Sequence, residues 1–360
     1  MLRPNFVRAQ VGDCEMFERH VQHLIQAIPK RGETVDLQHL FSKLTLDIAT
    51  DFLLGKSTDS LSPGGADAET KNFVKAIDRA MNGLGAQDEG LIFWIAVMMG
   101  IMVQNWTLRG EFKIVHNYVD GLIEKALAEK QKGLWVEGDN QDSIHSGEKP
   151  RYIFLHSLLN QTTDKLKIRS ELLNILLAGR ETTAALLSNL WFVLSKNPRI
   201  FNRLQHEIST TLPDNSPPTY ENLKEMKYLR AVLNESLRVH PIIPENARIA
   251  QVDTMLPLGG GDDGESPIFI KKGQIATWNV YAMHRRRDFY GDDAEEFKPE
   301  RWLDSEAGKV KGLRVGWEYL PFHGGPRICI GRTFSPLQRC SPSLFSIPLP
   351  QLPLTQLITN

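Results

Sequence analysis

Apolar residues recur at helical spacing over most of the first 240 residues of the chain. Between Asp36 and Gly55 they return every four positions, which predicts a helix that Asp36 caps and Gly55 ends. Similar spacing predicts further helices over residues 71–81, 111–132, 164–195, 198–210 and 219–238. Prolines at positions 241 and 244 end the last of these.

Beyond Pro244 the pattern changes to short apolar stretches between turn residues. Residues 247–252, 267–270 and 274–280 are expected to be strands, and the glycine-rich segment 259–264 is expected to be a turn between the first two. The polar residues 133–150 are expected to form an exposed loop. The sequence therefore predicts a mainly α fold with a small β region.

Composition narrows the class of protein. The chain has 360 residues, 41% of them apolar, and 42 basic against 43 acidic residues give a net charge of −1. This balance gives no sign of nucleic-acid binding. Three cysteines, none in a CxxC pair, argue against a disulfide scaffold and a structural zinc site and fit a reducing compartment. The longest apolar run, Leu91–Val103, is too short to span a bilayer.

The segment Phe322–Gly331 contains the strongest chemical signal. Glycines around Cys329 allow backbone to approach the sulfur closely, and Arg327 supplies a cation either near a thiolate or to an acidic group of a cofactor. A buried cysteine in a glycine-rich turn is the plain structural alternative. A phosphate-binding loop is a poorer one, because neither glycine-rich phosphate motif is present.

The pattern F-x-x-G-x-R-x-C-x-G, matched by Phe322, Gly325, Arg327, Cys329 and Gly331, resembles the haem loop of the cytochrome P450 superfamily. The resemblance implies a cytochrome P450-like fold that binds haem b (iron protoporphyrin IX). Cys329 would be the metal ligand, as the axial thiolate, and Arg327 a partner of a haem propionate. At position 323 the family commonly has glycine or another small residue, whereas this chain has histidine.

Two further motifs, each with a glutamate and an arginine, support this resemblance. Glu235 and Arg238 stand three residues apart on one predicted helix face, a spacing also common in surface pairs. In the family, this E-x-x-R motif and an arginine from a later P-E-R segment form a buried structural network. Glu235, Arg238 and Arg301 match those positions.

Residues 178–183 of the long predicted helix resemble the family's oxygen-activation motif. Glu181 and Thr182 would then be the catalytic pair that delivers protons, and a polar stripe on an amphipathic helix is the alternative. Arg248 matches a place where the family often has a further haem-propionate partner. A solvated arginine at the end of a strand is the alternative there.

Residues 178–184, 256–261 with 266–267, and 315–321 are similar to stretches of fungal enzymes that hydroxylate n-alkanes and fatty acids. This implies a monooxygenase that uses O2, an apolar long-chain substrate, and electrons that an NADPH-dependent flavoprotein reductase supplies. It also implies the cytosolic face of the endoplasmic reticulum membrane. Leu91–Val103 would be an interfacial segment there, or else a loop packed on the core.

The ends of the chain depart from the family pattern. We expect one incomplete haem-thiolate monooxygenase domain over 1–334, lacking the family's N-terminal part with its anchor and its C-terminal helix and hairpin. Residues 335–360, rich in proline and serine, are expected to be a disordered tail. Without the anchor, a cytoplasmic or peripheral location is the alternative. The alternatives to a monooxygenase are a truncated, non-catalytic remnant with weak or no haem binding, and a haem-thiolate isomerase or peroxygenase.

Overall fold

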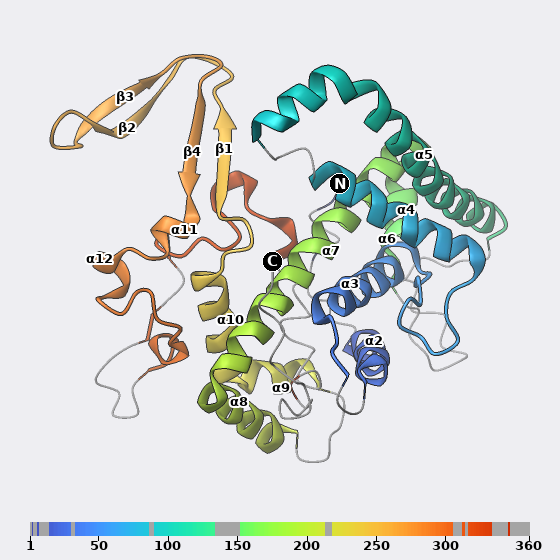
Figure 1. Ribbon diagram of the computed structural model, residues 1–360, viewed down its shortest axis with the longest axis horizontal. Helices are drawn as coiled ribbons and strands as arrows, with labels where there is room; N and C mark the ends of the chain where they lie inside the picture. The colour runs from blue at the N-terminus through green and yellow to red at the C-terminus, as the bar shows by residue number, and fades with distance from the viewer. Residues whose placement is uncertain are drawn as a thin grey trace. The chain divides into compact units, whose positions relative to one another are not determined.

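The computed structural model is mainly helical, with four strands between residues 245 and 279 among the residues that it describes (Figure 1). These residues are 2, 6, 14–29, 33–85, 90–133, 152–212, 218–304, 312–313, 316–332 and 345, with backbone alone for 82–85, 90–107 and 220. The predicted fold class is confirmed. The expected loop over 133–150, apart from Gly133, and the expected tail over 335–360, apart from Phe345, lie outside the described residues.

The chain divides into two compact units. The first unit comprises residues 1–188, 212–223 and 333–360, and the second comprises 189–211 and 224–332. Helix α7, Lys165–Lys196, contributes residues to both. A single domain over 1–334 stays a prediction.

The first unit is built from helices. They are α2 (Cys14–Ala27), α3 (Leu37–Leu54), α4 (Ala68–Gly85), α5 (Gly90–Gln131), α6 (Phe154–Gln161) and the larger part of α7. The short helix α9 (Tyr220–Glu225) begins in the same unit. Helix α3 is buried along most of its length and packs against α2 and α6. The core of this unit therefore lies around α3.

The predicted ends of α3 are confirmed. The carboxylate of Asp36 accepts a hydrogen bond from the backbone N–H of His39 at 3.0 Å. Gly55 ends the helix in the left-handed conformation, with φ of 71°, and its N–H donates to Asp51 O. Both are the ordinary chemistry of helix ends, which is why the sequence predicts them correctly.

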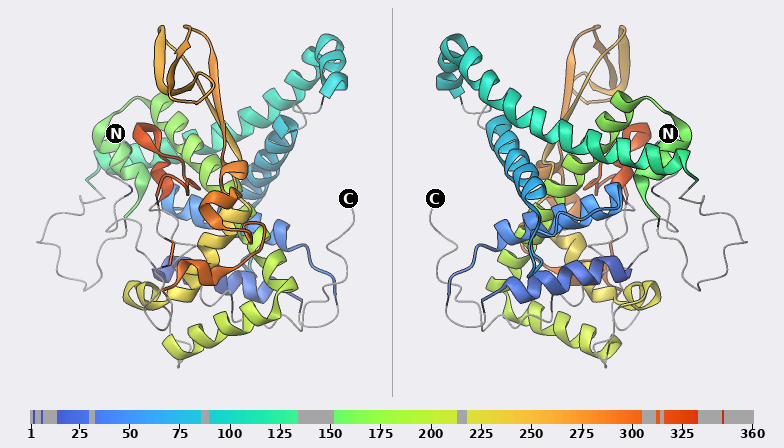
Figure 2. Two further views of the ribbon diagram at one scale, coloured as in Figure 1. Left: turned by 90° about the vertical axis from the view of Figure 1, so that its left-hand side faces the viewer. Right: turned by 90° about the vertical axis from the view of Figure 1, so that its right-hand side faces the viewer.

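Helix α5 is longer than expected. The sequence predicts a helix over 111–132, but α5 begins at Gly90, so the apolar run Leu91–Val103 belongs to the same helix (Figure 2). It runs beside α4. Among the described residues, no helix combines the length and the apolar character that a bilayer span requires.

The second unit holds α8 (Pro198–Thr211), α10 (Lys227–Val239), α11 (Val280–Met283), α12 (Arg287–Tyr290) and the 3-10 helix η3 (Pro299–Trp302). The sequence predicts one helix over 219–238, but the chain breaks at Met226, between α9 and α10. Glu207 of α8 accepts hydrogen bonds from the N–H groups of Tyr228 and Leu229, each at 2.8 Å. This carboxylate satisfies the free donors of a new helix start.

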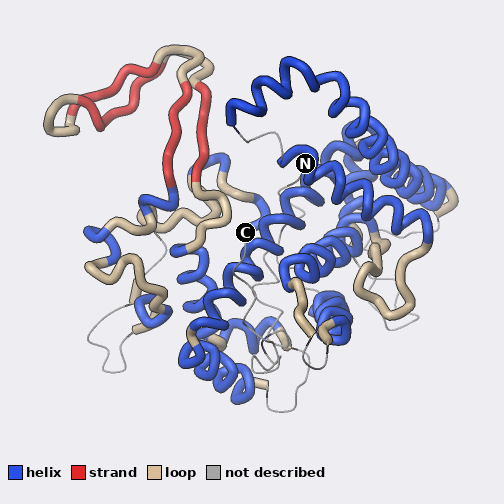
Figure 3. The backbone as a smooth tube through the Cα atoms, viewed as in Figure 1, coloured by secondary structure: helices blue, strands red, loops and turns tan. Residues whose placement is uncertain are grey.

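The strands form one hairpin nested inside another (Figure 3). Strand β1 (Glu245–Ile249) pairs antiparallel with β4 (Ile275–Asn279). Between them, β2 (Thr254–Gly260) pairs antiparallel with β3 (Ser266–Ile270), with an irregularity between Leu256 and Gly260. Strand β2 was not expected from the sequence, because Pro257 and the glycines that follow it are typical of turns. In a two-stranded ribbon a proline is tolerated on the outer edge, where its missing N–H has no partner to lose.

Candidate functional site

The cysteine loop, Phe322–Gly331, lies in the second unit and is closed by backbone hydrogen bonds. The N–H of Cys329 donates to Phe322 O at 3.0 Å, and the N–H of Ile328 donates to Gly325 O at 3.1 Å. Gly325 has φ of 70°, a conformation that L side chains rarely adopt. At Gly324 a Cβ would lie 2.8 Å from the ring of the exposed Trp317, so a larger residue there would displace that ring.

Cys329 presents a free thiol. Its side chain is exposed and forms no disulfide. Gly331 leaves one side of the sulfur bare, because the nearest side-chain atom to a Cβ built there would be Cys329 Sγ itself, at 3.6 Å. An accessible sulfur on a short, closed loop suits a ligand of a metal that binds from outside the chain. The third cysteine, Cys340, lies outside the described residues.

One arginine in this loop and one near it have no acidic partner among the described residues. Arg327 is exposed at the end of the 3-10 helix η4 (Gly325–Arg327), and the described residues contain no carboxylate in an ion pair with it. Arg248 of β1 lies over the ring of Trp278, 5.0 Å from its centroid, and it too has no carboxylate partner among the described residues. Arg248 Nη1 donates to Asn246 Oδ1 at 3.0 Å and to Ala247 O at 2.7 Å, so an anion would bind Arg248 through its other N–H groups. Arg327 would bind an anion through its exposed guanidinium group.

Trp278 connects β4 with the cysteine loop. Its indole N–H donates to His323 Nδ1 at 3.3 Å, and the two rings meet edge to face. His323 Nε2 is buried without a hydrogen-bond partner in the described structure. Trp278 was not expected to be part of the site, because no motif at this position distinguishes it from an ordinary strand tryptophan.

Glu235 and Arg238 of α10 are fully buried. The two carboxylate oxygens of Glu235 accept five hydrogen bonds, at 2.8–3.0 Å, from Arg238 Nε and Nη2, Arg301 Nε, Trp302 Nε1 and the Lys298 N–H. We call Glu235, Arg238, Arg301 and Trp302 the Glu235 network. It brings together the three residues that the E-x-x-R and P-E-R motifs single out, and adds Trp302, which directly follows the second motif.

Arg238 ties this network to the segment before the cysteine loop. It donates to the carbonyls of His284, Ala294 and Glu296. The imidazole of His284 contacts Arg238 O through Nδ1, at 3.3 Å, and accepts from the Leu320 N–H at Nε2, at 2.9 Å. Burial lowers the pKa of His284 to about 4, so the ring is neutral near pH 7.

Hydrogen bonds to Lys298 and Arg301 lower the pKa of Asp293 to about 2. Arg301 thus pairs with two carboxylates. One is Glu235, and the other is Asp293, whose Oδ1 lies 2.9 Å from Arg301 Nη1. Neither His284 nor Asp293 was expected from the sequence, because neither belongs to a recognisable motif. The partners of His284 come from distant segments, whereas Lys298 and Arg301 lie only five and eight residues from Asp293.

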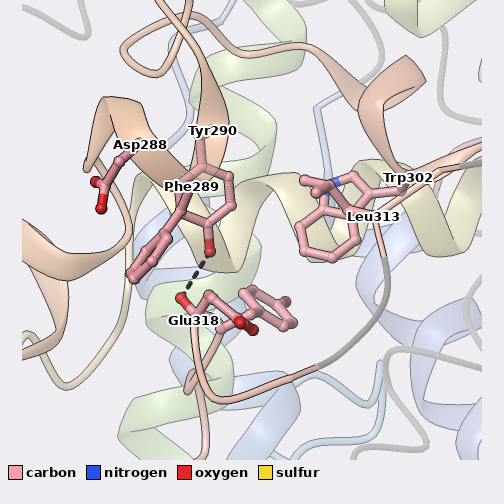
Figure 4. A pocket seen from close by; sticks show the side chains of 7 residues that line it. Asp288, Phe289, Tyr290, Trp302, Leu313 and Glu318 are labelled. Atoms are coloured by element: carbon pink, nitrogen blue, oxygen red, sulfur yellow. Dashed lines mark hydrogen bonds between the residues drawn. The ribbon is translucent and has the colours of Figure 1, made fainter.

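A cavity of about 330 Å³ lies beside the Glu235 network (Figure 4). Aromatic side chains and two carboxylates line it: Asp288, Phe289, Tyr290, Trp302, Leu313, Glu318 and Tyr319. The hydroxyl of Tyr290 donates to Glu318 O at 2.8 Å. None of the predicted haem or catalytic residues lines it, so this cavity is separate from the cysteine loop.

Glu181 and Thr182 lie in the part of α7 that belongs to the first unit. The Thr182 hydroxyl donates to Ala178 O at 2.7 Å, one turn back along the helix. Glu181 is half-exposed and lies 3.2 Å from a guanidinium nitrogen of Arg180. Arg180 itself is buried and also pairs with Asp78 of α4. Glu181 therefore combines access to solvent with an ion pair to a buried guanidinium group.

Comparisons with known proteins agree with the resemblance. The family model described as Cytochrome P450 matches residues 5–338. The chain is 41% identical to Cytochrome P450 monooxygenase himC of Aspergillus japonicus over 336 residues, which is 93% of this chain and 57% of that protein. It is also 41% identical to Cytochrome P450 52A12 of Debaryomyces hansenii and Cytochrome P450 52A1 of Candida tropicalis, each over 93% of this chain. It spans 63% and 60% of their lengths.

Proposed function

The chain belongs to the cytochrome P450 family, and on that premise we propose that it is a haem-thiolate monooxygenase of apolar, long-chain substrates such as n-alkanes or fatty acids. One atom of O2 enters a C–H bond of the substrate and the other leaves as water. Two electrons from NADPH, passed on by a flavoprotein reductase, and two protons complete the balance. The similarity of residues 178–184 and 256–261 to fungal alkane and fatty-acid hydroxylases supports the substrate class.

The observation that carries the proposal is the free, exposed thiol of Cys329 on a closed glycine-rich loop. The loop fixes the backbone at Cys329, because the Cys329 N–H donates to Phe322 O at 3.0 Å. Deprotonated, this sulfur would be the protein ligand of the haem iron. The haem, when bound, would supply the redox chemistry that activates O2, and a thiolate ligand would promote it.

The donors around the loop fit the acidic edge of a haem b. Arg327 and Arg248 are guanidinium groups without a carboxylate partner among the described residues, and each can bind a propionate through two N–H groups. Phe322, Gly325 and Gly331 shape the loop around the sulfur. The Glu235 network, in this proposal, braces the segment that leads into the loop, through Arg238, His284 and Leu320.

Glu181 and Thr182 deliver protons in this proposal. The Glu181 carboxylate exchanges protons with water at its exposed side, and Thr182 Oγ1 passes a proton on while Ala178 O fixes its rotamer. The proposed location is the cytosolic face of the endoplasmic reticulum membrane. At this membrane both the reductase and apolar substrates would be available to the enzyme.

Reconstitution tests the proposal. The chain is loaded with haem b and supplied with a flavoprotein reductase, NADPH, ¹⁸O2, and either an n-alkane or a fatty acid of equal chain length. We expect an alcohol carrying one ¹⁸O atom. Haem uptake without any oxygenated product would instead support a non-catalytic remnant. Conversion of an organic peroxide without reductase and NADPH would support an isomerase or peroxygenase.

The Thr182→Ala variant tests the proton pair in the same assay. We expect it to lower the amount of alcohol formed per NADPH consumed, while haem uptake is unchanged. Ser188→Ala is the matched control, because the Ser188 hydroxyl donates to Ala184 O on the same helix in the same way. An equal ratio of product to NADPH in both variants would exclude the role of Thr182.

A further inference from the structure

The two ring nitrogens of His323 have different roles. The indole N–H of Trp278 is only a donor, so His323 Nδ1, at 3.3 Å, must accept. Burial and the nearby guanidinium of Arg248 lower the pKa of His323, which favours the neutral ring. A neutral imidazole that accepts at Nδ1 carries its proton at Nε2. Trp278 therefore selects the tautomer that has a donor at Nε2.

This donor has no acceptor within the described residues. His323 Nε2 is buried and makes no hydrogen bond there. A buried N–H left unpaired costs about 1–3 kcal/mol. His323 also has φ of 58°, a conformation that is uncommon for residues other than glycine. The position therefore carries two costs that glycine, which the family commonly has there, would avoid.

The surroundings of His323 are rich in donors and positive charge. Arg248 lies over the same Trp278 ring that contacts His323. Arg327 follows on the same loop. The described residues provide neither of these arginines with a carboxylate. A group that accepts from His323 Nε2 beside a guanidinium group is favoured if it carries negative charge, as a carboxylate does.

We propose that His323 Nε2–H donates a hydrogen bond to a propionate of the bound haem, and that Trp278 is a positioning residue that holds His323 in the required tautomer. This inference rests on the proposed function. It adds His323 to the two arginines as a third propionate partner, at a position where the family motif does not require one. Formation of this bond on haem binding would offset the cost of the unpaired donor.

Haem release from the ferric holoprotein to excess apomyoglobin tests the proposal. His323→Gly removes the donor and also relieves the left-handed backbone. We expect haem release to be about fivefold to tenfold faster, the kinetic equivalent of about 1 kcal/mol for one hydrogen bond. The apoprotein is expected to be as stable as the wild type or more so. A purely structural role for His323 would not separate these two measurements.

Haem dimethyl ester, in which both propionates are esterified, identifies the acceptor. With this haem, His323→Gly and the wild type should release at the same rate. Trp278→Phe, which removes only the indole donor, should show a smaller increase with haem b and none with the ester. Asp59→Gly is the matched control, because Asp59 also has positive φ, at 45°, but lies in the first unit.

The outcomes separate this proposal from the proposed function. If the wild type shows thiolate-ligated haem but His323→Gly releases haem b at the wild-type rate, the role of His323 is wrong and the proposed function stands. The same holds if faster release persists with the dimethyl ester. If the wild type takes up no haem, both proposals are wrong.

Discussion

Arg238 holds Glu235 by two parallel hydrogen bonds inside the second unit. Nε donates to Oε2 and Nη2 donates to Oε1, each at 2.8 Å. The two residues are one helical turn apart on α10, and neither side chain is exposed to solvent. Burial of such a pair is tolerated when further hydrogen bonds satisfy the remaining sites of the two side chains. Arg301, Trp302 and the Lys298 N–H complete that set.

Neutralising Glu235 should therefore destabilise the protein strongly. In Glu235→Gln, two buried guanidinium groups lose their shared carboxylate, and we expect the free energy of unfolding to fall by about 3–5 kcal/mol. Urea unfolding measures it. Glu300→Gln is the control, because Glu300 pairs with Arg203 near the surface, and exposed pairs contribute about 1 kcal/mol or less. If the free energy of unfolding fell equally in the two variants, burial of the Glu235 network would not contribute to stability.

His284 predicts a loss of stability in mild acid. The unfolded chain binds a proton there below about pH 6.5, whereas the folded chain binds it only near pH 4. Stability should therefore be full above pH 6.5, fall by up to about 3 kcal/mol as the pH drops to 4, and then level off. Urea unfolding from pH 7.5 to pH 4 follows this loss.

The variant His284→Gln isolates this contribution. Burial also lowers the pKa values of His116, His156 and His240, so these residues add slope of the same sign. His284→Gln should be less stable than the wild type at pH 7.5 but have a flatter profile between pH 6.5 and pH 4. Parallel profiles for the two proteins would rule out His284 as a source of the slope.

Asp78 should stabilise the first unit through Arg180. Only 7% of the Arg180 side chain is exposed, and Asp78 of α4 pairs with it. In Asp78→Asn the half-exposed Glu181 is the one carboxylate left to this buried cation among the described residues, so we expect a loss of about 1–3 kcal/mol in thermal or urea unfolding. Glu124→Gln, which breaks the exposed pair with Lys165, should cost less than about 1 kcal/mol. Equal effects would contradict this assignment.

Gly325 and Gly264 have similar backbone conformations, so substitutions at the two positions can be compared. Both have positive φ, 70° and 75°, and neither has an atom within 4 Å of a Cβ built on it. Substitution by alanine should therefore cost about 1 kcal/mol at each, from backbone strain alone. Only Gly325→Ala should also weaken haem binding, because only Gly325 shapes the cysteine loop. Haem titration distinguishes them, and equal haem affinities would show that the loop conformation does not matter.

The ends of an element could be predicted from the sequence where interactions between neighbouring residues determine them. Asp36 and Gly55 bound α3 because their caps involve only the adjacent turns of the helix. The break at Met226 could not be predicted, because the group that caps α10 is Glu207 of a different helix. Strand β2 was missed because Pro257 and Gly259 oppose a strand locally, while pairing with β3 overrides that preference.

The candidate site also has parts that the sequence predicts and parts that it does not. The motif around Cys329 is contiguous, so its loop could be identified from the sequence. The motifs also singled out Glu235, Arg238 and Arg301, but not the carbonyls of His284 and Ala294 that Arg238 binds. Every residue has a backbone carbonyl, so residue identity does not show which carbonyls accept these hydrogen bonds. Trp278 and His323 meet only because β4 and the cysteine loop come together in the fold.

The most direct measurement for the central claim is the absorption spectrum of the reduced, haem-loaded protein under carbon monoxide. If Cys329 is the thiolate ligand, the wild type will show the red-shifted Soret band of thiolate-ligated haem, and Cys329→Ala will lose it while Cys14→Ala retains it. A Soret band typical of nitrogen ligation in the wild type, or a thiolate band that survives in Cys329→Ala, would contradict the account.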